Sequence, residues 1–398
     1  MRGTLPVPVV AMVFLTFVLG ISEFIVMGIL PDIAEGIGVA YTDVGGLVSV
    51  YALGYAVLTP MVAAVMGRFN RFRVMVVFTV LFILVDAWSM LATDYLSMLL
   101  SRVATAAVAG FLFSLGLAIT VEVVSPEARA GSMAWMYAGF NMSTIAGLPL
   151  GTLVTESFGW RSAFLMILAM AVLALVLLWV SVPHGAGSVE RPTGGSGGAA
   201  DLVRDPRVIL GAMVTVFAFG GSYCIFTYIT PILEDMVGLD GSMVGAGLML
   251  FGVMCLVSNL VAGRLSGMGG FRLAHITFGV QILVMLSMPL VAGIPVASMA
   301  FLMAVGLMMY LMNSSAQMAI MDVASRDYPG AMTLASSINP MAFNVGIVAG
   351  SYVAGAVFDG AGVEFLGFGG AVFIAMALVS ALVLRRYCSA PGRGTCVT

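Results

Sequence analysis

Long apolar segments recur along the whole 398-residue chain, and they constrain its fold more than any other feature. A helix needs about 20 apolar residues to cross the hydrocarbon core of a bilayer. Twelve segments approach or exceed this length, near residues 8–31, 44–66, 74–92, 96–121, 133–154, 161–183, 208–233, 243–265, 272–293, 296–321, 332–358 and 365–384. Only 9% of the residues are charged, too few to cover a water-soluble protein. The sequence therefore predicts an all-α polytopic membrane protein with twelve transmembrane helices.

The arginines predict how these helices are oriented. If the first helix starts in the cytoplasm, fourteen of the sixteen basic residues fall on the cytoplasmic side. Of the other two, Arg161 falls on the opposite side and Arg102 lies within a helix. Cytoplasmic loops of membrane proteins carry an excess of Lys and Arg. We therefore expect a multi-pass protein of the inner (cytoplasmic) membrane with both termini in the cytoplasm.

A polar stretch divides the chain after the sixth predicted helix. Residues 184–207 are rich in Gly and Ser, a composition typical of flexible linkers. The sequence thus predicts an N-terminal six-helix bundle over residues 1–183, a cytoplasmic linker over 184–207, and a C-terminal six-helix bundle over 208–398 that ends in a short cytoplasmic tail.

The two halves also share an internal repeat. An offset of 200 residues aligns 17–45 with 217–245, and nine of the 29 positions are identical, Ser22 and Ser222 among them. An offset of 199 pairs Gly147 with Gly346 and Gly151 with Gly350. Homologous halves related by an axis along the membrane normal are typical of transporters that bind substrate near the midplane.

Several motifs occur in an order that identifies a family. They read SEFIVMGILPDIA in the first helix, VYALGYAVLTP in the second, GRFNRFR in the next loop, SRVATAAVAG in the fourth helix, AGLPLGTLV and FGWRSAF around the fifth, and TYITPILEDMVG after the seventh. The chain resembles the major facilitator superfamily, and within it the drug:proton antiporter branch that includes bacterial sugar and arabinose efflux permeases. The resemblance implies alternating access, with helices 1, 4, 7 and 10 around a central cavity.

The chain departs from the family pattern at the loop between its second and third helices. Gly67 stands where the family usually has an aspartate that helps to latch the two halves, whereas Arg68 and Arg71 are retained. The resemblance implies a gating role for these arginines, in addition to their effect on topology.

A glycine and proline motif in the fifth helix has the form seen in the sugar-efflux branch. It comprises Gly147, Pro149 and Gly151, followed by Thr152. Small residues permit close approach of helices, and proline frees a carbonyl and bends the helix. The resemblance implies that this segment controls leakage and antiport, and simple helix packing is the alternative.

Three charged residues lie within predicted membrane helices and away from their ends: Glu23, Asp86 and Arg102. A charge at the bilayer centre costs at least ~2.5–3.5 kcal/mol, so each needs a physical reason. At about 1.5 Å per residue, Glu23 lies ~22 Å, Arg102 ~21 Å and Asp86 ~18 Å from the inner face. Glu23 and Arg102 are therefore candidate partners, and Asp86 is a rival partner for Arg102.

These residues suggest a site of proton coupling. Glu23 has apolar neighbours and an arginine at the same depth, so it can load and release a proton as its surroundings change. Three alternatives stay open. Glu23 can be a polar residue of the outer vestibule, Arg102 can be a buried charge that holds the first half together, and Asp86 can face the outer vestibule.

Neutral hydrogen-bonding side chains supply candidates for the substrate cavity. They suit a substrate with hydroxyl or amide groups, although polar contacts between helices use the same residue types. These candidates are Tyr51, Tyr55, Asn141, Tyr223, Tyr228, Asn313, Gln317 and Asn344. Tyr223 is the repeat mate of Glu23, and the stretches 208–233, 243–262 and 273–321 carry no charged residue.

We expect a secondary active transporter, in which proton-coupled efflux of a small organic molecule such as a drug or sugar-like compound is favoured. The alternatives are proton-coupled or facilitated uptake of a nutrient, and a transporter-like sensor or lipid-handling protein. Motifs of metalloproteases, P-loop proteins and serine hydrolases are absent from the sequence, so we do not expect an enzyme. The expected partners are a small-molecule substrate, protons and the lipid bilayer, with no cofactor, metal or nucleic acid. We expect a functional monomer.

Overall fold

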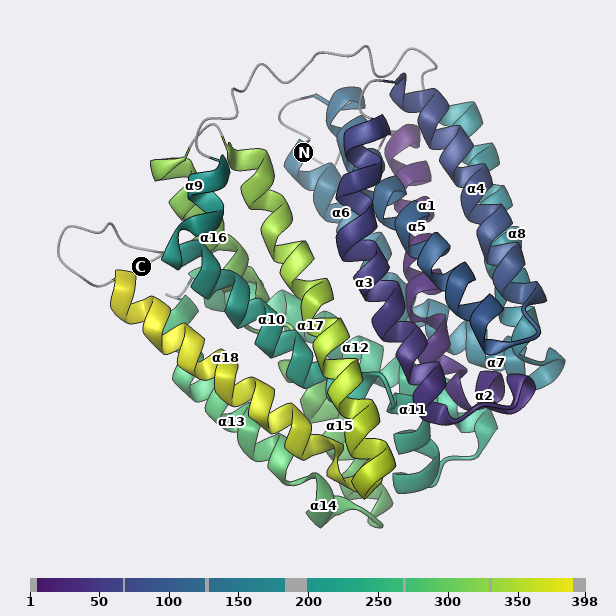
Figure 1. Cartoon of the computed structure of the whole chain (residues 1–398), viewed down its shortest axis with the longest axis vertical. Coiled ribbons are helices and arrows are strands. Elements are labelled where there is room, and N and C mark those ends of the chain that lie inside the picture. Colours follow the sequence, from purple (N-terminus) through teal and green to yellow (C-terminus); the bar gives the residue numbers. More distant parts are fainter. Residues whose placement is uncertain are drawn as a thin grey trace. The chain divides into compact units, whose positions relative to one another are not determined.

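The computed structural model describes residues 6–66, 69–125, 129–182, 199–267, 270–328 and 331–388. Within these ranges all regular structure is helical (Figure 1). Ten helices of the described part are long and apolar enough to cross a membrane. The prediction of an all-helical membrane protein is therefore confirmed.

The chain forms two compact units, and the first comprises Met1–Arg191 and Asp240–Met249. Its helices up to residue 181 are α1 (Val7–Gly28), α2 (Leu30–Ile37), α3 (Tyr41–Met66), α4 (Arg71–Leu91), α5 (Tyr95–Val123), α6 (Arg129–Met142), the π-helical turn η2 (Ser143–Gly147), α7 (Leu148–Phe158) and α8 (Trp160–Ser181).

The second unit comprises Pro192–Leu239 and Leu250–Thr398, so residues of α12 belong to both units. The helices from residue 199 onward are α9 (Ala199–Arg204), α10 (Pro206–Phe226), α11 (Ile229–Pro231), the π-helical turn η3 (Ile232–Met236), α12 (Gly241–Gly267), α13 (Ala274–Leu286), α14 (Met288–Val291), α15 (Pro295–Met308), α16 (Asn313–Asp327), α17 (Met332–Ala361) and α18 (Leu366–Cys388), with short 3-10 turns at Gly270–Arg272 and Val363–Phe365.

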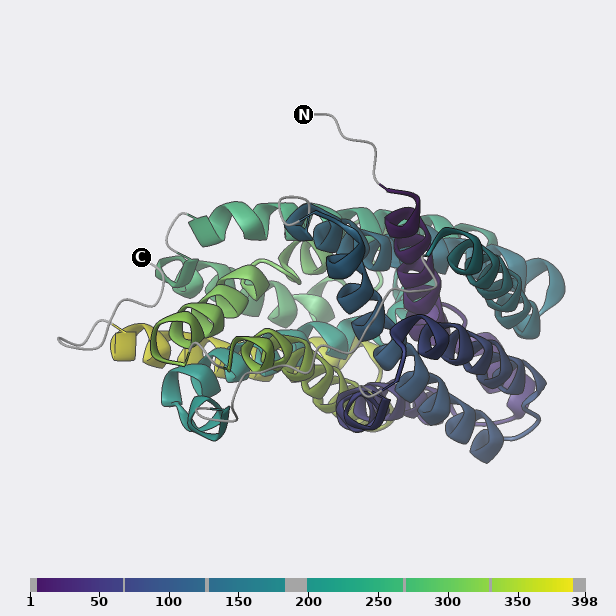
Figure 2. The ribbon, with the colours of Figure 1, turned by 90° about the horizontal axis from the view of Figure 1, so that it is seen from above.

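Each unit is built around one largely apolar helix that is buried on all sides over much of its length. In the first unit every residue of α1 from 18 to 28 is buried, and α1 packs on α5, α6 and α8. In the second unit every residue of α10 from 218 to 226 is buried, and α10 lies beside α17 and α18 (Figures 1 and 2). A helix that is hydrophobic all round must be covered by lipid or by other helices, and here other helices cover much of α1 and α10. The two central helices are the ones that the sequence repeat aligns.

Prolines and turns interrupt several of the predicted spans. The predicted span 133–154 consists of α6, η2 and α7, because Pro149 cannot donate to the carbonyl four residues before it. The predicted span 272–293 divides into α13 and α14 just before Pro289. The predicted span 296–321 divides into α15 and α16 at a turn over residues 309–312.

The polar stretch predicted as a linker ends in helical structure. Residues 184–198 lie outside the described part of the chain, whereas Ala199–Arg204 forms α9. Asp205 then caps α10, because its Oδ1 accepts a hydrogen bond of 2.8 Å from the main-chain N–H of Arg207. Pro206 at the first turn of α10 has a backbone angle that suits a helix start. These local features show that the chain is helical from residue 199, so the stretch 199–207 is not an unstructured linker.

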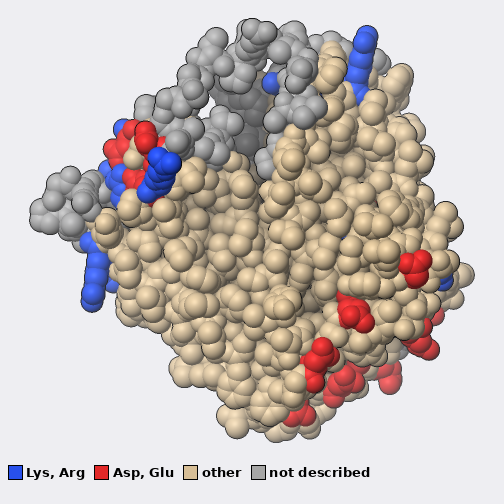
Figure 3. All heavy atoms as spheres, in the orientation of Figure 1, with Lys and Arg blue, Asp and Glu red and all other residues tan. Residues whose placement is uncertain are grey.

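A broad part of the surface of the first unit carries no charged side chains. On the face seen in Figure 3, uncharged residues separate a basic side chain at the upper right from acidic side chains at the lower right. Arg73 of α4, Asp32 and Glu35 of α2, and Glu156 of α7 are all exposed. An uncharged band between charged ends is what a bilayer requires.

Candidate functional site

Arg102 joins three helices of the first unit. Its side chain extends from α5 and is only 1% exposed. Its Nη2 donates hydrogen bonds to the main-chain carbonyl of Ser22 at 2.7 Å and to that of Glu23 at 3.4 Å, both on α1. The guanidinium carbon lies 4.4 Å from the ring centroid of Tyr51 on α3, a cation–π contact. Arg102 therefore connects α5 to both α1 and α3.

A helical main chain can accept these bonds without losing its own. Each carbonyl oxygen has two lone pairs, so the carbonyls of Ser22 and Glu23 can accept from Arg102 in addition to the helical N–H. Bonds from a charged donor are stronger than neutral ones. The site thus holds a buried cation by main-chain dipoles.

Asp86 enters the same network through Ser22. Asp86 lies on α4 and is fully buried, and its Oδ1 accepts a hydrogen bond of 2.9 Å from the hydroxyl of Ser22. Ser22 therefore contacts Asp86 with its side chain and Arg102 with its carbonyl. The sequence reasoning did not place Ser22 in the site, although its identity with Ser222 in the repeat was a usable signal.

Glu23 is close to Arg102 through its main chain, not through its carboxylate. Its side chain is buried, with the residue 6% exposed. In the described ranges, its carboxylate takes part in no hydrogen bond or ion pair, and Arg102 forms no ion pair with either Glu23 or Asp86. The depth estimate correctly brought Glu23, Asp86 and Arg102 together. The direct ion pair that it suggested for Arg102 is replaced by bonds to carbonyls.

Part of the hydrogen-bonding capacity at this site is not used by protein groups. Four buried atoms have no partner among the described residues: Nε and Nη1 of Arg102, Oδ2 of Asp86 and the hydroxyl of Tyr51. Buried polar groups are nearly always hydrogen-bonded, and exceptions are frequent at functional sites. These atoms leave the site chemically open to protons and small polar groups.

The other cavity candidates of the first unit do not join the Arg102 network. Tyr55 is half-buried on α3, one turn after Tyr51. Asn141 is half-buried near the end of α6, where its main-chain carbonyl accepts a bond of 2.8 Å from Thr144. Of the three candidates in this unit, Tyr51 is the one that contacts a charged group of the site.

The tyrosines and Asn344 of the second unit lie among helix contacts. Tyr223 is fully buried and packs edge-on against Phe343, with ring centroids 5.8 Å apart. Tyr228 is also buried and stacks on Phe358 at 4.8 Å. Asn344 donates its amide to the carbonyl of Pro340, on its own helix, at 3.1 Å.

Asn313 belongs to a chain of polar side chains that links α10, α17 and α16. Asn339 of α17 donates to Oδ1 of Asn313 at 2.9 Å, and Oδ1 of Asn339 accepts from Thr215 of α10 at 2.5 Å. Gln317 is half-buried one turn further along α16. The sequence reasoning selected Asn313 and Gln317 but missed Thr215 and Asn339, although Asn339 is of the same residue type as Asn313.

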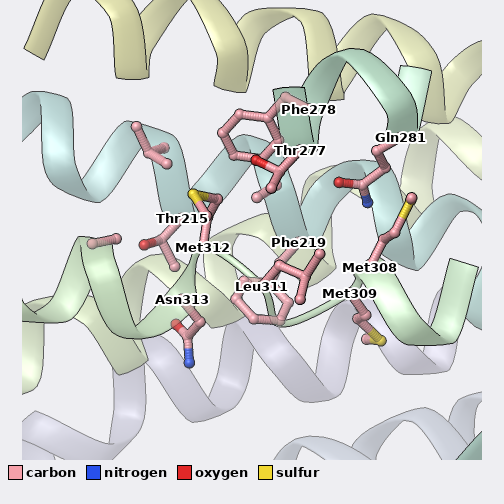
Figure 4. Close-up of a pocket in the computed structure, with 13 residues that line it drawn as sticks. Thr215, Phe219, Thr277, Phe278, Gln281, Met308, Met309, Leu311, Met312 and Asn313 are labelled. Carbon is pink, nitrogen blue, oxygen red and sulfur yellow. The ribbon is translucent and has the colours of Figure 1, made fainter. Parts of the chain in front are cut away.

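A small pocket lies beside this chain, between α10, α13 and the turn that joins α15 to α16 (Figure 4). Its polar lining includes Thr215, Thr277, Gln281 and Asn313, and methionines supply much of the rest. The space suffices for about one water molecule at most. This pocket is a feature of the second unit alone and is too small for a drug or a sugar.

The glycines of the fifth-helix motif lie directly against α1. A β-carbon at Gly147 would collide with Ile21, and one at Gly151 would collide with the end of Ile25. Pro149 begins α7 immediately after the π-helical turn. The missing side chains allow η2 and α7 to approach the helix that carries Glu23.

The two gating arginines are placed only in part. Arg68 lies outside the described residues. Arg71 is the first residue of α4, which Asn70 caps by accepting a bond of 3.1 Å from the N–H of Arg73.

Comparison with known proteins identifies the family. The model of the Major Facilitator Superfamily matches residues 12–337. The chain belongs to the major facilitator superfamily. This confirms the resemblance noted in the sequence and makes the chain a multi-pass membrane transporter of that superfamily.

Two relatives and one solved structure show how far the similarity extends. This superfamily member is 31% identical over 386 residues to the inner membrane transport protein YdhP of Escherichia coli (strain K12), with 95% of this chain and 96% of YdhP covered. It is 25% identical to a probable sugar efflux transporter of Mannheimia succiniciproducens, over 93% and 92% of the two chains. The crystal structure of a D-xylose-proton symporter shares the major facilitator fold, with a TM-score of 0.77, 14% identity, and coverage of 97% and 98%.

Proposed function

We propose that this transporter is a proton-coupled exporter of a small organic molecule, in which Glu23 loads and releases the coupling proton. One observation carries the proposal. Glu23 is a buried carboxylate without an ion-pair partner in the described part of the chain, although Arg102 lies against its own main chain.

The physical reason lies in the balance of charge. A carboxylate within a membrane is costly, and the cost falls when a proton neutralises it or when a cation lies nearby. The guanidinium of Arg102 is held by carbonyls and does not neutralise Glu23 by direct contact. Glu23 can therefore exist with or without a proton, and a change in its exposure during alternating access shifts that balance.

The direction of transport is proposed on two supports. The relative from Mannheimia succiniciproducens is named as a probable sugar efflux transporter. The motif of Gly147, Pro149 and Gly151 has the form of the sugar-efflux branch, and it packs on the helix that carries Glu23. We further propose a monomer in the cytoplasmic membrane with both termini in the cytoplasm, as the arginine distribution favours.

The neutral residues favour an uncharged substrate with hydroxyl or amide groups. In the second unit, Thr215, Asn339 and Asn313 form a continuous set of neutral hydrogen-bonding groups. Charged groups at membrane depth in the first unit then serve the proton, and neutral groups in the second serve the substrate. A sugar-like compound or a neutral drug fits this division.

Everted membrane vesicles with an acidic interior test the proposal. A panel of antibiotics, sugars and nucleosides is added while a pH-sensitive dye reports the proton gradient. We expect at least one compound to dissipate the gradient with the wild type, and Glu23→Gln to abolish that response. Glu35→Gln is the matched control, because Glu35 is an exposed carboxylate on α2.

Two results would contradict the proposal. Equal coupling in Glu23→Gln and Glu35→Gln would remove Glu23 from the mechanism. Accumulation of a panel compound by intact cells that express the protein, without any response in everted vesicles, would establish uptake instead of export.

A further inference from the structure

The two halves contain the same serine link with different partners. In the first unit, the hydroxyl of Ser22 donates to Oδ1 of Asp86 at 2.9 Å. In the second unit, Nε2 of Gln281 donates to the hydroxyl oxygen of Ser222 at 3.4 Å. Ser22 and Ser222 are repeat mates, and the partners lie on α4 and α13, each the third predicted span of its half.

The direction of each hydrogen bond follows from the partner's chemistry. A serine hydroxyl has one proton, and a carboxylate can only accept, so Ser22 must donate to Asp86. The amide of Gln281 can donate, which leaves the proton of Ser222 for the carbonyl of Ala218, four residues earlier, at 3.1 Å. The two serines therefore orient their hydroxyls differently.

A protonated aspartic acid resembles an amide in this respect. It has one donor and retains acceptor capacity, as the glutamine side chain does. The link between Ser222 and Gln281 therefore shows the arrangement that Ser22 and Asp86 would adopt once a proton is bound to Asp86. In that arrangement the hydroxyl of Ser22 would donate to the carbonyl of Val18, four residues earlier on α1.

Protonation of Asp86 would affect the charged groups that lie around it. The helices packed on α4 are α5 and α8. On α5, Arg102 binds the carbonyl of Ser22, whereas α8 carries no ionisable side chain from residue 162 to its end. The adjoining α1 and α3 contribute Glu23 and Tyr51. Arg102 is thus the cation, and Glu23 the second acid, near this aspartate.

We propose that Asp86 is a second proton-binding site, and that Ser22 is a positioning residue that reverses its hydrogen bond when Asp86 gains or loses a proton. The proton adds to a carboxylate oxygen of Asp86, and no other bond is made or broken except hydrogen bonds. The role of this step in transport rests on the proposed function. Protonation of Asp86 removes one of the two negative charges near Arg102 and thereby favours the ionised form of Glu23.

Infrared difference spectroscopy of the full chain in lipid nanodiscs, without any substrate, tests this. Spectra are compared between about pH 5 and about pH 9, where buried carboxyl groups titrate. We expect a carbonyl band of a protonated carboxyl group that disappears in Asp86→Asn and persists in Glu23→Gln. We expect Ser22→Ala to move the midpoint of that band upward by about one pH unit, because a charge-assisted bond to the carboxylate is lost.

Matched variants separate the hydrogen bond from general damage to the fold. Ser22→Thr keeps a hydroxyl and should retain the wild-type midpoint, and Ser222→Ala removes the equivalent hydroxyl from the second unit and should not move it. The inference is overturned if no titrating band is lost in Asp86→Asn, or if Ser22→Ala behaves as Ser222→Ala does. The vesicle assay of Glu23→Gln is independent of this readout, so either proposal can fail while the other stands.

Discussion

The Nη2 atom of Arg102 lies 2.7 Å from the carbonyl oxygen of Ser22, so the main chain of α1 holds this buried guanidinium. Side-chain substitutions on α1 cannot remove that carbonyl. The positive charge of Arg102 therefore does not depend on an ion pair with one particular acid. Because Arg102 does not bind the carboxylates of Glu23 and Asp86, these remain available for protons.

Exchange of the charges between Glu23 and Arg102 should therefore fail to restore the protein. We expect Glu23→Arg and Arg102→Glu each to lower stability and transport, and the double variant to remain impaired, because neither new side chain recreates the bonds to the carbonyls. Thermal unfolding of the neutral variants Glu23→Gln and Arg102→Gln in a double-mutant cycle should give an interaction energy at the low end of the about 0.5–3 kcal/mol found for neighbouring residues, because Arg102 lies near the Glu23 carboxylate without bonding to it. Rescue by the exchanged charges would instead demonstrate a direct ion pair.

Replacement of Arg102 by lysine should be harmful although the charge is kept. Lysine lacks the planar guanidinium that lies over the ring of Tyr51 while its Nη2 donates to two carbonyls. We expect Arg102→Lys to lower the free energy of unfolding by about 1–3 kcal/mol, the usual cost of unpaired buried polar groups. Arg73→Lys, at an exposed position of α4, should leave the melting temperature in detergent unchanged. Equal melting temperatures for the two variants would refute this role of Arg102.

Alanine at Gly147 and Gly151 should disturb the contacts of η2 and α7 with α1. Gly147→Ala and Gly151→Ala place a methyl group against Ile21 and Ile25, and overpacking of this kind costs about 1–3 kcal/mol. The matched control is Gly279→Ala on α13, where an added β-carbon meets nothing within 4 Å. There we expect a neutral change or a gain of up to about 1 kcal/mol. The idea is wrong if all three variants unfold at the same temperature.

Acid should weaken the ion pairs at the start of α10 in the second unit. Asp205 pairs with Arg207 at 2.6 Å, and Arg207 also reaches Asp327 at 2.5 Å on α16. Burial raises the pKa of Asp205, but hydrogen bonds from Arg207 and Tyr328 outweigh it and lower the pKa below its ordinary value of 3.8. A carboxyl with a lowered folded-state pKa contributes stability above the unfolded-state value, and this contribution is lost as pH falls through the folded-state value.

We therefore expect the melting temperature of the wild type to fall below about pH 4, and Asp205→Asn to remove part of that dependence. Asp201→Asn is the control, since Asp201 is exposed on α9. An unchanged acid profile in Asp205→Asn would exclude this ion-pair cluster as a source of stability.

The sequence predicted the helices because the physical signal is long and simple. Runs of apolar residues must be covered by lipid or by other helices, and the repeat identified α1 and α10, which are the central helices of their units. A bend at Pro149 was expected, whereas the breaks at Pro289 and at residues 309–312 were missed, although Pro289 marks the first of these. A turn in an apolar helix changes few residues, so it barely alters the hydrophobic pattern.

The site was harder to predict for a different reason. The shared depth of Glu23 and Arg102 follows from the helical rise, but every residue has a carbonyl, so no side-chain pattern indicates which carbonyls Arg102 binds. The bond from Thr215 to Asn339 joins residues 124 positions apart. Such pairs depend on how the helices rotate against one another, and packing sets that rotation.

The turn at residues 309–312 has a consequence for biogenesis. With 14 residues, α15 rises about 21 Å, and α16 with 15 residues rises about 22 Å, so neither alone crosses a hydrocarbon core of about 30 Å. The sequence of α16 is also rich in Ser, Asp and other polar residues, which insertion machinery accepts poorly in isolation. The two helices must therefore enter the membrane as one segment, with the apolar α15 carrying the polar α16.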